Sequence, residues 1–145
     1  MDSIRVKRRE LIEIEVNDEH ETISIDPNDR RFVANIMGFV KTLRDCMSEL
    51  QERANTLKLK AETEPDNAII EAIEYESTIS NKAAKELDSI FGEGACDKIF
   101  GKGVAPSLDM INDFFTQIVP FIQKALEKRN RSIGNKYAPK RGGSV

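Results

Sequence analysis

The sequence predicts a mainly α-helical fold (α+β), with three to four helices, a small N-terminal β-hairpin and a disordered basic C-terminal tail. Apolar residues alternate with glutamate near the N-terminus and then recur at helical spacing over long stretches. Glycine, proline and positive charge without apolar periodicity end the chain. We therefore expect one helical domain over residues 1–130, hairpin included, and a flexible basic tail over residues 131–145.

The hairpin is expected over about residues 10–26. Residues 12–16 alternate isoleucine or valine with glutamate, which is the period of a half-buried strand. Asn17 and Asp18 supply turn chemistry, and residues 22–25 alternate again. An isolated hairpin is marginal in water, so its isoleucine face has to pack on the helices or on a partner.

A first long helix is expected to begin with Asp26 as its N-cap and Pro27 at its first position. Its apolar residues follow one another at alternating steps of three and four, the heptad pattern of helices that pack along their length. They are Val33, Ile36, Val40, Leu43, Met47, Leu50, Ala54 and Leu57. The partner helix lies either in the same chain, as a helical hairpin, or in another copy.

Pro65 interrupts this pattern, and Asp66 or Asn67 can cap a second helix. An antiparallel pair with the first helix is the most economical arrangement. The apolar residues of the second helix are Ile69, Ile70, Ile73, Ile79, Ala83, Leu87, Ile90 and Phe91, with polar residues between them.

The glycine-rich segment that follows is predicted to be a bend rather than a nucleotide-binding loop. A phosphate-binding Walker loop needs serine or threonine after its Gly-Lys pair, whereas Gly103 follows Lys102 here. We expect Gly92 to end the second helix in the left-handed conformation and residues 95–100 to form one or two helical turns. Ile99 and Phe100 would point inward.

A last long helix is predicted to begin after Ser107, its N-cap. Its apolar residues form a broad face, as expected of a helix that packs on more than one neighbour. They are Leu108, Ile111, Phe114, Phe115, Ile118, Val119, Ile122 and Leu126.

No catalytic, cofactor or metal site is apparent in the sequence. Cys46 and Cys96 lack metal-ligand spacing and are expected to be free thiols, and His20 is expected to be a solvated turn residue. No stretch approaches the roughly 18 consecutive apolar residues of a membrane span. The net charge of -3 does not favour nucleic-acid binding. The basic end is either solvated, a docking arm for an acidic partner, or a nucleic-acid contact.

The order of motifs resembles a known family. The sequences F-G-E-G (91–94), D-K-I-F-G (97–101), F-F-T-Q-I-V-P-F-I-Q-K (114–124) and K-Y-A-P-K-R (136–141) follow the acidic hairpin and the long helices. This order resembles that of the small tail assembly chaperones of long-tailed, siphovirus-type phages and prophages of Gram-positive bacteria. The similarity extends over roughly residues 10–140 and is closest over 91–128.

The resemblance implies a non-enzymatic protein of the bacterial host cytoplasm, without cofactors, that is absent from the mature virion. Such chaperones bind the extended, largely helical tape-measure protein and help to recruit tail-tube subunits. The helix faces expected to contact these partners, or another copy, carry Met47, Leu50, Leu57, Phe114, Phe115, Phe121 and Ile122. The alternatives are a structural component that stays in the tail and a nucleic-acid-binding regulator that acts through the basic tail.

Overall fold

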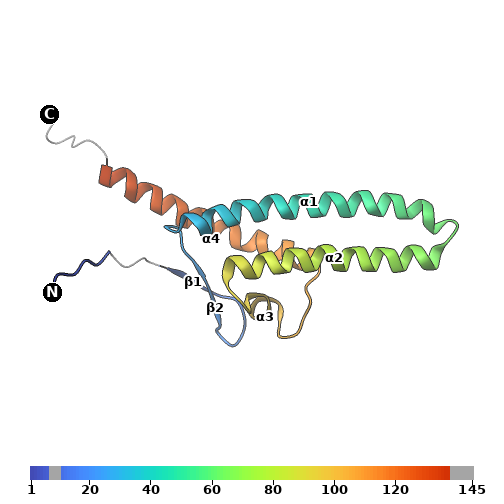
Figure 1. Cartoon of the computed structure of the whole chain (residues 1–145), viewed down its shortest axis with the longest axis horizontal. Coiled ribbons are helices and arrows are strands. Elements are labelled where there is room, and N and C mark those ends of the chain that lie inside the picture. Colours follow the sequence, from blue (N-terminus) through green and yellow to red (C-terminus); the bar gives the residue numbers. More distant parts are fainter. Residues whose placement is uncertain (7–10, 138–145) are drawn as a thin grey trace.

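The computed structural model describes residues 1–6 and 11–137 of the chain. Within these residues, two short strands precede four helices. The strands are β1 (Ile12–Glu15) and β2 (Thr22–Ile25), and the helices are α1 (Arg30–Ala61), α2 (Pro65–Phe91), α3 (Ala95–Phe100) and α4 (Leu108–Tyr137). The fold is therefore mainly helical with a small N-terminal hairpin, as predicted (Figure 1).

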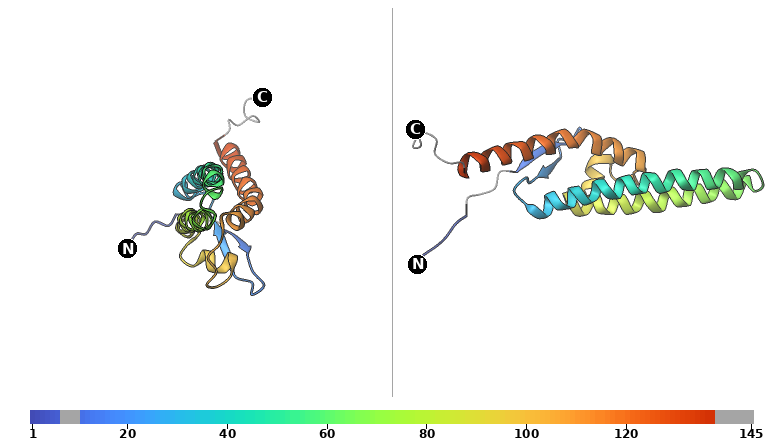
Figure 2. Two further views of the ribbon diagram at one scale, coloured as in Figure 1. Left: turned by 90° about the vertical axis from the view of Figure 1, so that its right-hand side faces the viewer. Right: turned by 90° about the horizontal axis from the view of Figure 1, so that it is seen from above.

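The three long helices lie at the corners of a triangle when seen end-on (Figure 2, left). α1 and α2 form a long antiparallel hairpin, and α4 lies beside it on one face (Figures 1 and 2). α4 covers only the half of this hairpin nearest the strands. Past Cys46 of α1 and before Ile79 of α2, the buried residues of these two helices are Leu57 and Ala68. We call this part, residues 47–61 and 65–78, the distal hairpin, and the remainder the proximal hairpin.

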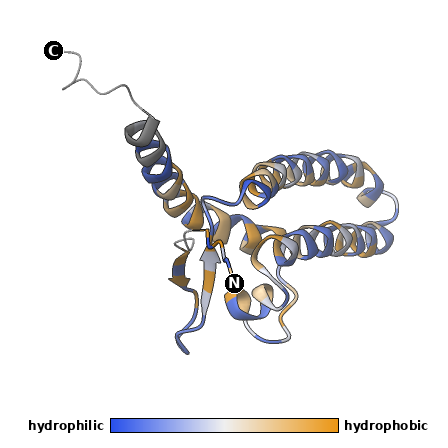
Figure 3. Ribbon diagram, turned by 60° about the vertical axis from the view of Figure 1, so that its left-hand side comes forward, coloured by the Kyte–Doolittle hydropathy of each residue, from blue (hydrophilic) through white to orange (hydrophobic). Residues whose placement is uncertain are grey.

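The core lies where the proximal hairpin, α4 and the strands meet. Apolar residues gather there in Figure 3. The largest side chains with almost no exposure are Phe39, Ile25, Leu87, Leu108 and Ile111, so each long helix and β2 contribute to one cluster.

The β-hairpin is held to α3 through its turn. β1 and β2 pair antiparallel, with Ile12 opposite Ile25. The Asn17 side chain accepts hydrogen bonds from backbone amides within the turn and donates one to the Lys98 carbonyl of α3, at 3.1 Å. His20 is an exposed turn residue with a positive φ of 63°, in agreement with its predicted place.

The starts of the first two long helices differ from the predictions. Asp29 rather than Asp26 is the N-cap of α1, and its carboxylate accepts from the Arg31 amide at 2.9 Å. Asp26 instead caps the preceding turn, where it accepts from the Asn28 amide. α2 begins at Pro65, before the predicted caps, because proline is well suited to the first helical position, where its missing N–H has no partner to lose.

The packing of α1 on α2 corrects half of the predicted heptad pattern. The buried residues of proximal α1 are Phe32, Ile36, Phe39, Leu43 and Cys46. Ile36 and Leu43 belong to the predicted pattern. In place of the other predicted residues, 33, 40 and 47, the structure buries their neighbours at 32, 39 and 46. The reason is that α1 faces two helices. Phe39 contacts Phe115 of α4, so the buried set meets that helix as well as α2. Val33 and Val40 lie beside this set and line a groove along α4.

The glycine segment forms the predicted bend. Gly92, Gly94, Gly101 and Gly103 all have positive φ, and α3 spans the expected residues. Gly92 ends α2 with a positive φ, but its angles (φ 107°, ψ 157°) lie outside the left-handed helical region that was predicted for it. The residue in that region is Gly94, with φ 83° and ψ 2°.

The last helix is longer than predicted. α4 continues to Tyr137, so residues 131–137 are helical and are not part of a flexible tail. The remainder of the predicted tail, residues 138–145, lies outside the described residues. The Ser107 hydroxyl accepts from the Met110 amide at 3.3 Å, as expected of the N-cap.

Candidate functional site: two apolar grooves along α4

α4 carries a buried row of side chains with a groove on each side of it. The row packs into the core and comprises Leu108, Ile111, Phe115, Ile118, Ile122 and Ala125. The α3 groove lies between α4, α3 and β1, and the α1 groove lies between α4 and the start of α1.

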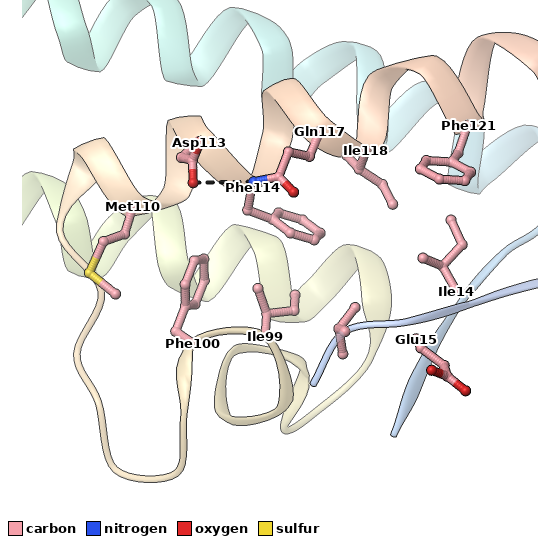
Figure 4. Close-up of a pocket in the computed structure, with 11 residues that line it drawn as sticks. Ile14, Glu15, Ile99, Phe100, Met110, Asp113, Phe114, Gln117, Ile118 and Phe121 are labelled. Atoms are coloured by element: carbon pink, nitrogen blue, oxygen red, sulfur yellow. Dashed lines mark hydrogen bonds between the residues drawn. The ribbon is translucent and has the colours of Figure 1, made fainter. Parts of the chain in front are cut away.

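The α3 groove has a volume of about 520 Å³. Phe114, Ile118 and Phe121 reach into it from α4, opposite Ile99 and Phe100 of α3 (Figure 4). Ile14 of β1 closes the end next to Phe121, and Met110 lies at the other end (Figure 4). Phe121 is 49% exposed and Met110 39%, so two large apolar side chains lie open to solvent at its rim.

Local sequence chemistry places α3 opposite α4. The positive φ angles of Gly92 and Gly94 reverse the chain after α2, a conformation that L-residues with a side chain rarely adopt. The Asp88 carboxylate of α2 then accepts a hydrogen bond from the Cys96 amide in the first turn of α3, at 2.9 Å. This bond satisfies one of the free amides of the short helix and fixes it to α2.

A chain of aromatic contacts joins the α3 groove to the core. Phe32 of α1 contacts Phe91 of α2 with ring centroids 5.8 Å apart, and Phe91 contacts Phe114 at 5.9 Å. Phe114 in turn contacts Phe100 of α3 at 6.0 Å. All three pairs are edge-to-face, the favourable geometry for aromatic rings. The floor of the groove is therefore held by packing that begins at α1.

The rim of the α3 groove is acidic. Among the described residues, its lining includes the carboxylates of Glu15 and Asp113 and no lysine or arginine. Asp113 accepts a hydrogen bond from the Gln117 side chain at 3.2 Å (Figure 4), and Glu15 lies 3.3 Å from the His20 ring nitrogen. An apolar floor with an acidic rim suits an amphipathic segment that has basic flanks.

The α1 groove is smaller and almost entirely apolar. It has a volume of about 200 Å³, and Gln123 is the one polar residue in the lining that the described part of the chain supplies. Phe115 and Ile122 form its floor together with Val33 and Val40. Met37, at its edge, is 68% exposed.

The structure separates the seven residues that the sequence singled out for partner contacts. Phe114 and Phe121 line the α3 groove, and Phe115 and Ile122 line the α1 groove, where both are at least nine-tenths buried. On α1, Met47 is 39% exposed, whereas Leu50 packs against the core and Leu57 is 7% exposed. Phe121 and Met47 are thus the predicted residues most accessible to a partner.

Sequence reasoning missed Met37 and Met110 as groove residues. Neither belongs to the regularly spaced apolar residues on which the prediction was based. Exposed methionine next to apolar residues on a helix is a usable signal, because its flexible side chain adapts to varied partners. Ile14 could not be assigned to the groove from the sequence, because its proximity to α4 depends on how the hairpin packs.

The two thiols are buried within the fold. Cys46 and Cys96 are free, as predicted. Burial, together with the hydrogen bond and charge of Asp88, raises the pKa of Cys96 to about 12. Burial also raises the pKa of Cys46. Over residues 1–6 and 11–137, no cluster of three or more histidine, cysteine, aspartate or glutamate residues is placed to hold a metal ion. None of the described helices has both the length and the apolar character of a membrane span.

Comparison with known proteins identifies the family. Residues 18–143, which include every element except β1, match a family of unknown function (DUF6673). Searches of curated proteins and of solved structures found no match to the chain. Because the match extends over most of its length, this chain belongs to the DUF6673 family.

Proposed function

We propose that this protein is a tail assembly chaperone of a long-tailed phage or prophage, with the α3 groove as the binding site for its tape-measure partner. In this role it acts in the cytoplasm of the bacterial host, helps to recruit tail-tube subunits and leaves before the virion is complete. The proposal rests on the resemblance described above together with one structural observation. The stretch of closest resemblance, residues 91–128, supplies the α3 and α4 walls of the α3 groove.

The groove suits such a partner physically. A long helical chain with an apolar stripe aggregates unless the stripe is covered, and a groove between helices can cover it by the helix-in-groove mode. Phe114 and Phe121 would be the aromatic anchors, since a few large side chains carry most of the binding energy at interfaces. Their open rim and the acidic residues Glu15 and Asp113 favour a partner helix with basic flanks.

The test is co-expression with fragments of the tape-measure protein encoded near the gene for this chain. We expect the wild-type chain to raise the soluble fraction of a fragment and to co-purify with it. Phe121→Ser should abolish both effects while leaving the fold unchanged, because this side chain is 49% exposed. Leu59→Ser, which removes another exposed apolar side chain far from the groove, is the matched control.

The assignment is wrong if no tape-measure fragment associates with the wild-type chain, with or without tail-tube protein. Mass spectrometry of purified particles tests the remaining part. The chain should be missing from finished virions, and its presence there in stoichiometric amounts would instead identify a structural tail component.

A further inference from the structure

The N-terminal segment, residues 1–6, is amphipathic and lies apart from the helices (Figures 1 and 2). It belongs to no helix or strand, and Ile4 is 95% and Val6 90% exposed. A segment of this length is too short for a stable helix, so an extended conformation is expected. Because side chains alternate along an extended chain, Ile4 and Val6 lie on one side of it and Arg5 on the other.

The charges of this end of the chain and of the α3 groove are opposite. Over residues 4–9 the sequence has four cations and no carboxylate. Among the described residues, the α3 groove is lined by Glu15 and Asp113 and by no lysine or arginine. The exposed face of the β-hairpin adds further carboxylates, Glu13 and Glu21. An apolar and basic segment therefore precedes a strand that borders an apolar and acidic groove.

The groove has room for the two apolar side chains. Phe121 and Met110 lie half-open at its rim, and Phe114 is part of its floor (Figure 4). The α4 wall from Met110 to Phe121 is about 17 Å long. In an extended segment Ile4 and Val6 are about 7 Å apart, so both fit along this wall. Their docking would cover apolar surface that is now exposed to water.

The connection to β1 is long enough for docking within one chain. Ile14 of β1 closes the groove at its Phe121 end. Val6 is six residues before Ile12, which allows a span of about 20 Å. Ile12 lies about 7 Å from Ile14 along β1, so about 13 Å of reach remains along the groove. A tether of this length keeps the segment at millimolar effective concentration, which favours the groove of the same chain over that of another copy.

We propose that the N-terminal segment docks in the α3 groove of its own chain, with Ile4 and Val6 on the apolar floor and Arg5 at the acidic rim. The structure shows the groove with the segment released. In the docked state the segment is an internal occupant, and a partner that binds the groove has to displace it. The inference concerns the chain alone and does not depend on the identity of that partner.

A spin label on the segment tests the docking directly. Ser3→Cys provides an attachment point next to Ile4 without removing an apolar side chain. The native thiols Cys46 and Cys96 are buried and their pKa values are raised, so a nitroxide reagent should react at residue 3. In NMR spectra of the labelled full-length chain, the amide signals of Gln117 and Phe121 should lose intensity relative to the same sample with the nitroxide reduced.

Two variants test the contact from its two sides. Ile4→Ser with Val6→Ser, in the labelled chain, should restore the Gln117 signal, and Phe121→Ser should restore it in part. The signals of Ile69 and Ile73 on the distal hairpin are the internal control and should keep their intensity throughout. A mixture of spin-labelled chain without ¹⁵N and unlabelled ¹⁵N chain reports contacts between copies, and its Gln117 signal should stay sharp.

Three results would overturn the proposal. One is a labelled wild-type segment that leaves the Gln117 and Phe121 signals unchanged. Another is a signal loss that the double serine variant does not reduce. The third is a signal loss in the mixture as large as within one chain, which would show that the segment binds another copy. Because no partner protein is used, each of these results can be told apart from a failure of the proposed function.

Discussion

Gly101 occupies a backbone conformation that a side chain would strain. Its φ is 112°, and a Cβ added there would lie 3.2 Å from a methyl carbon of Val104. We expect Gly101→Ala to lower the free energy of unfolding by about 1–3 kcal/mol, the usual cost of a residue held in such a region. Urea denaturation monitored by circular dichroism measures this loss, and an unchanged midpoint would show that the loop adapts at no cost.

Gly38 gives the opposite expectation from the same substitution. It lies within α1, and a Cβ there would meet nothing within 4 Å. Gly38→Ala should raise the free energy of unfolding by about 0.5–1 kcal/mol, because alanine restricts the unfolded chain and favours the helix. A destabilised Gly38→Ala variant would mean that another chain approaches α1 closely at this position.

The Cys96 thiol should make stability fall at alkaline pH. Its pKa is about 12 in the fold, compared with an ordinary value of 9.0, so the folded chain keeps a proton that the unfolded chain loses. The contribution is complete below pH 9 and declines as the pH rises from 9 toward 12. Urea midpoints measured from pH 8 to pH 11 should fall less steeply for Cys96→Ala than for the wild type; parallel curves would contradict the assigned cause.

Local features that depend only on neighbouring residues could be predicted from the sequence. The turn position of His20 and the bend at the glycine segment both follow from a few consecutive residues. The backbone angles of Gly92 could not be predicted in this way. They depend on the position of α3, which the hydrogen bond from the Cys96 amide to the Asp88 carboxylate fixes.

At the level of helices, mutation can test which apolar residues of α1 are buried in the core. Phe39 is fully buried, whereas its neighbour Val40 is half-buried. Phe39→Ala should cost about 3–5 kcal/mol of unfolding free energy. Val40→Ala should cost about 1 kcal/mol, because the removed methyl groups are partly exposed already. Equal losses of unfolding free energy, measured by urea denaturation, would show that residue 40 is packed as tightly as residue 39, as the predicted heptad pattern requires.

There is a physical reason why the sequence did not show which of two neighbouring sets of apolar residues on α1 is buried. Four apolar residues recur every seven positions and are common to both possible patterns: Ile36, Leu43, Leu50 and Leu57. The predicted pattern adds residues 33, 40 and 47 to them, and the alternative adds residues 32, 39 and 46. Two neighbouring positions can complete the pattern, and both are apolar in the proximal hairpin. One set is buried between α2 and α4, where Phe39 contacts Phe115, and the other lines the groove beside α4. A sequence can show that a helix has a broad apolar face, but the direction of its neighbours is a property of the assembled fold.

The end of α4 illustrates the same limit. Glycine, proline and positive charge after Lys128 indicated a flexible tail, yet the helix continues to Tyr137. Helix propensity is a weak prior, and a helix that is already formed extends at little cost because each further residue adds a hydrogen bond.

At the scale of the whole molecule, the α3 groove joins segments that are far apart in the sequence. Ile14, Ile99 and Phe121 line one cavity although two long helices, α1 and α2, separate β1 from α3 and α4 in the sequence. The sequence identified Phe114 and Phe121 as contact residues because they lie on an apolar helix face. It could not indicate that Ile14 closes one end of the cavity, because the position of β1 depends on the hairpin being tied to α3 through Asn17 and Lys98.

The elongated shape predicts that partner binding at the α3 groove is independent of the distal hairpin. The α3 groove is lined by α3, α4 and β1, whereas Ile69 and Ile73 are exposed on the distal hairpin. Mutations at sites that share no contacts usually act independently. We therefore expect Ile69→Ser combined with Ile73→Ser to solubilise a tape-measure fragment as well as the wild type does, whereas Phe121→Ser should not solubilise it. Loss of binding in the double isoleucine variant, with its helical circular dichroism spectrum retained, would show that the fragment also contacts the distal hairpin, and the assignment of the α3 groove as the separate binding site would then be wrong.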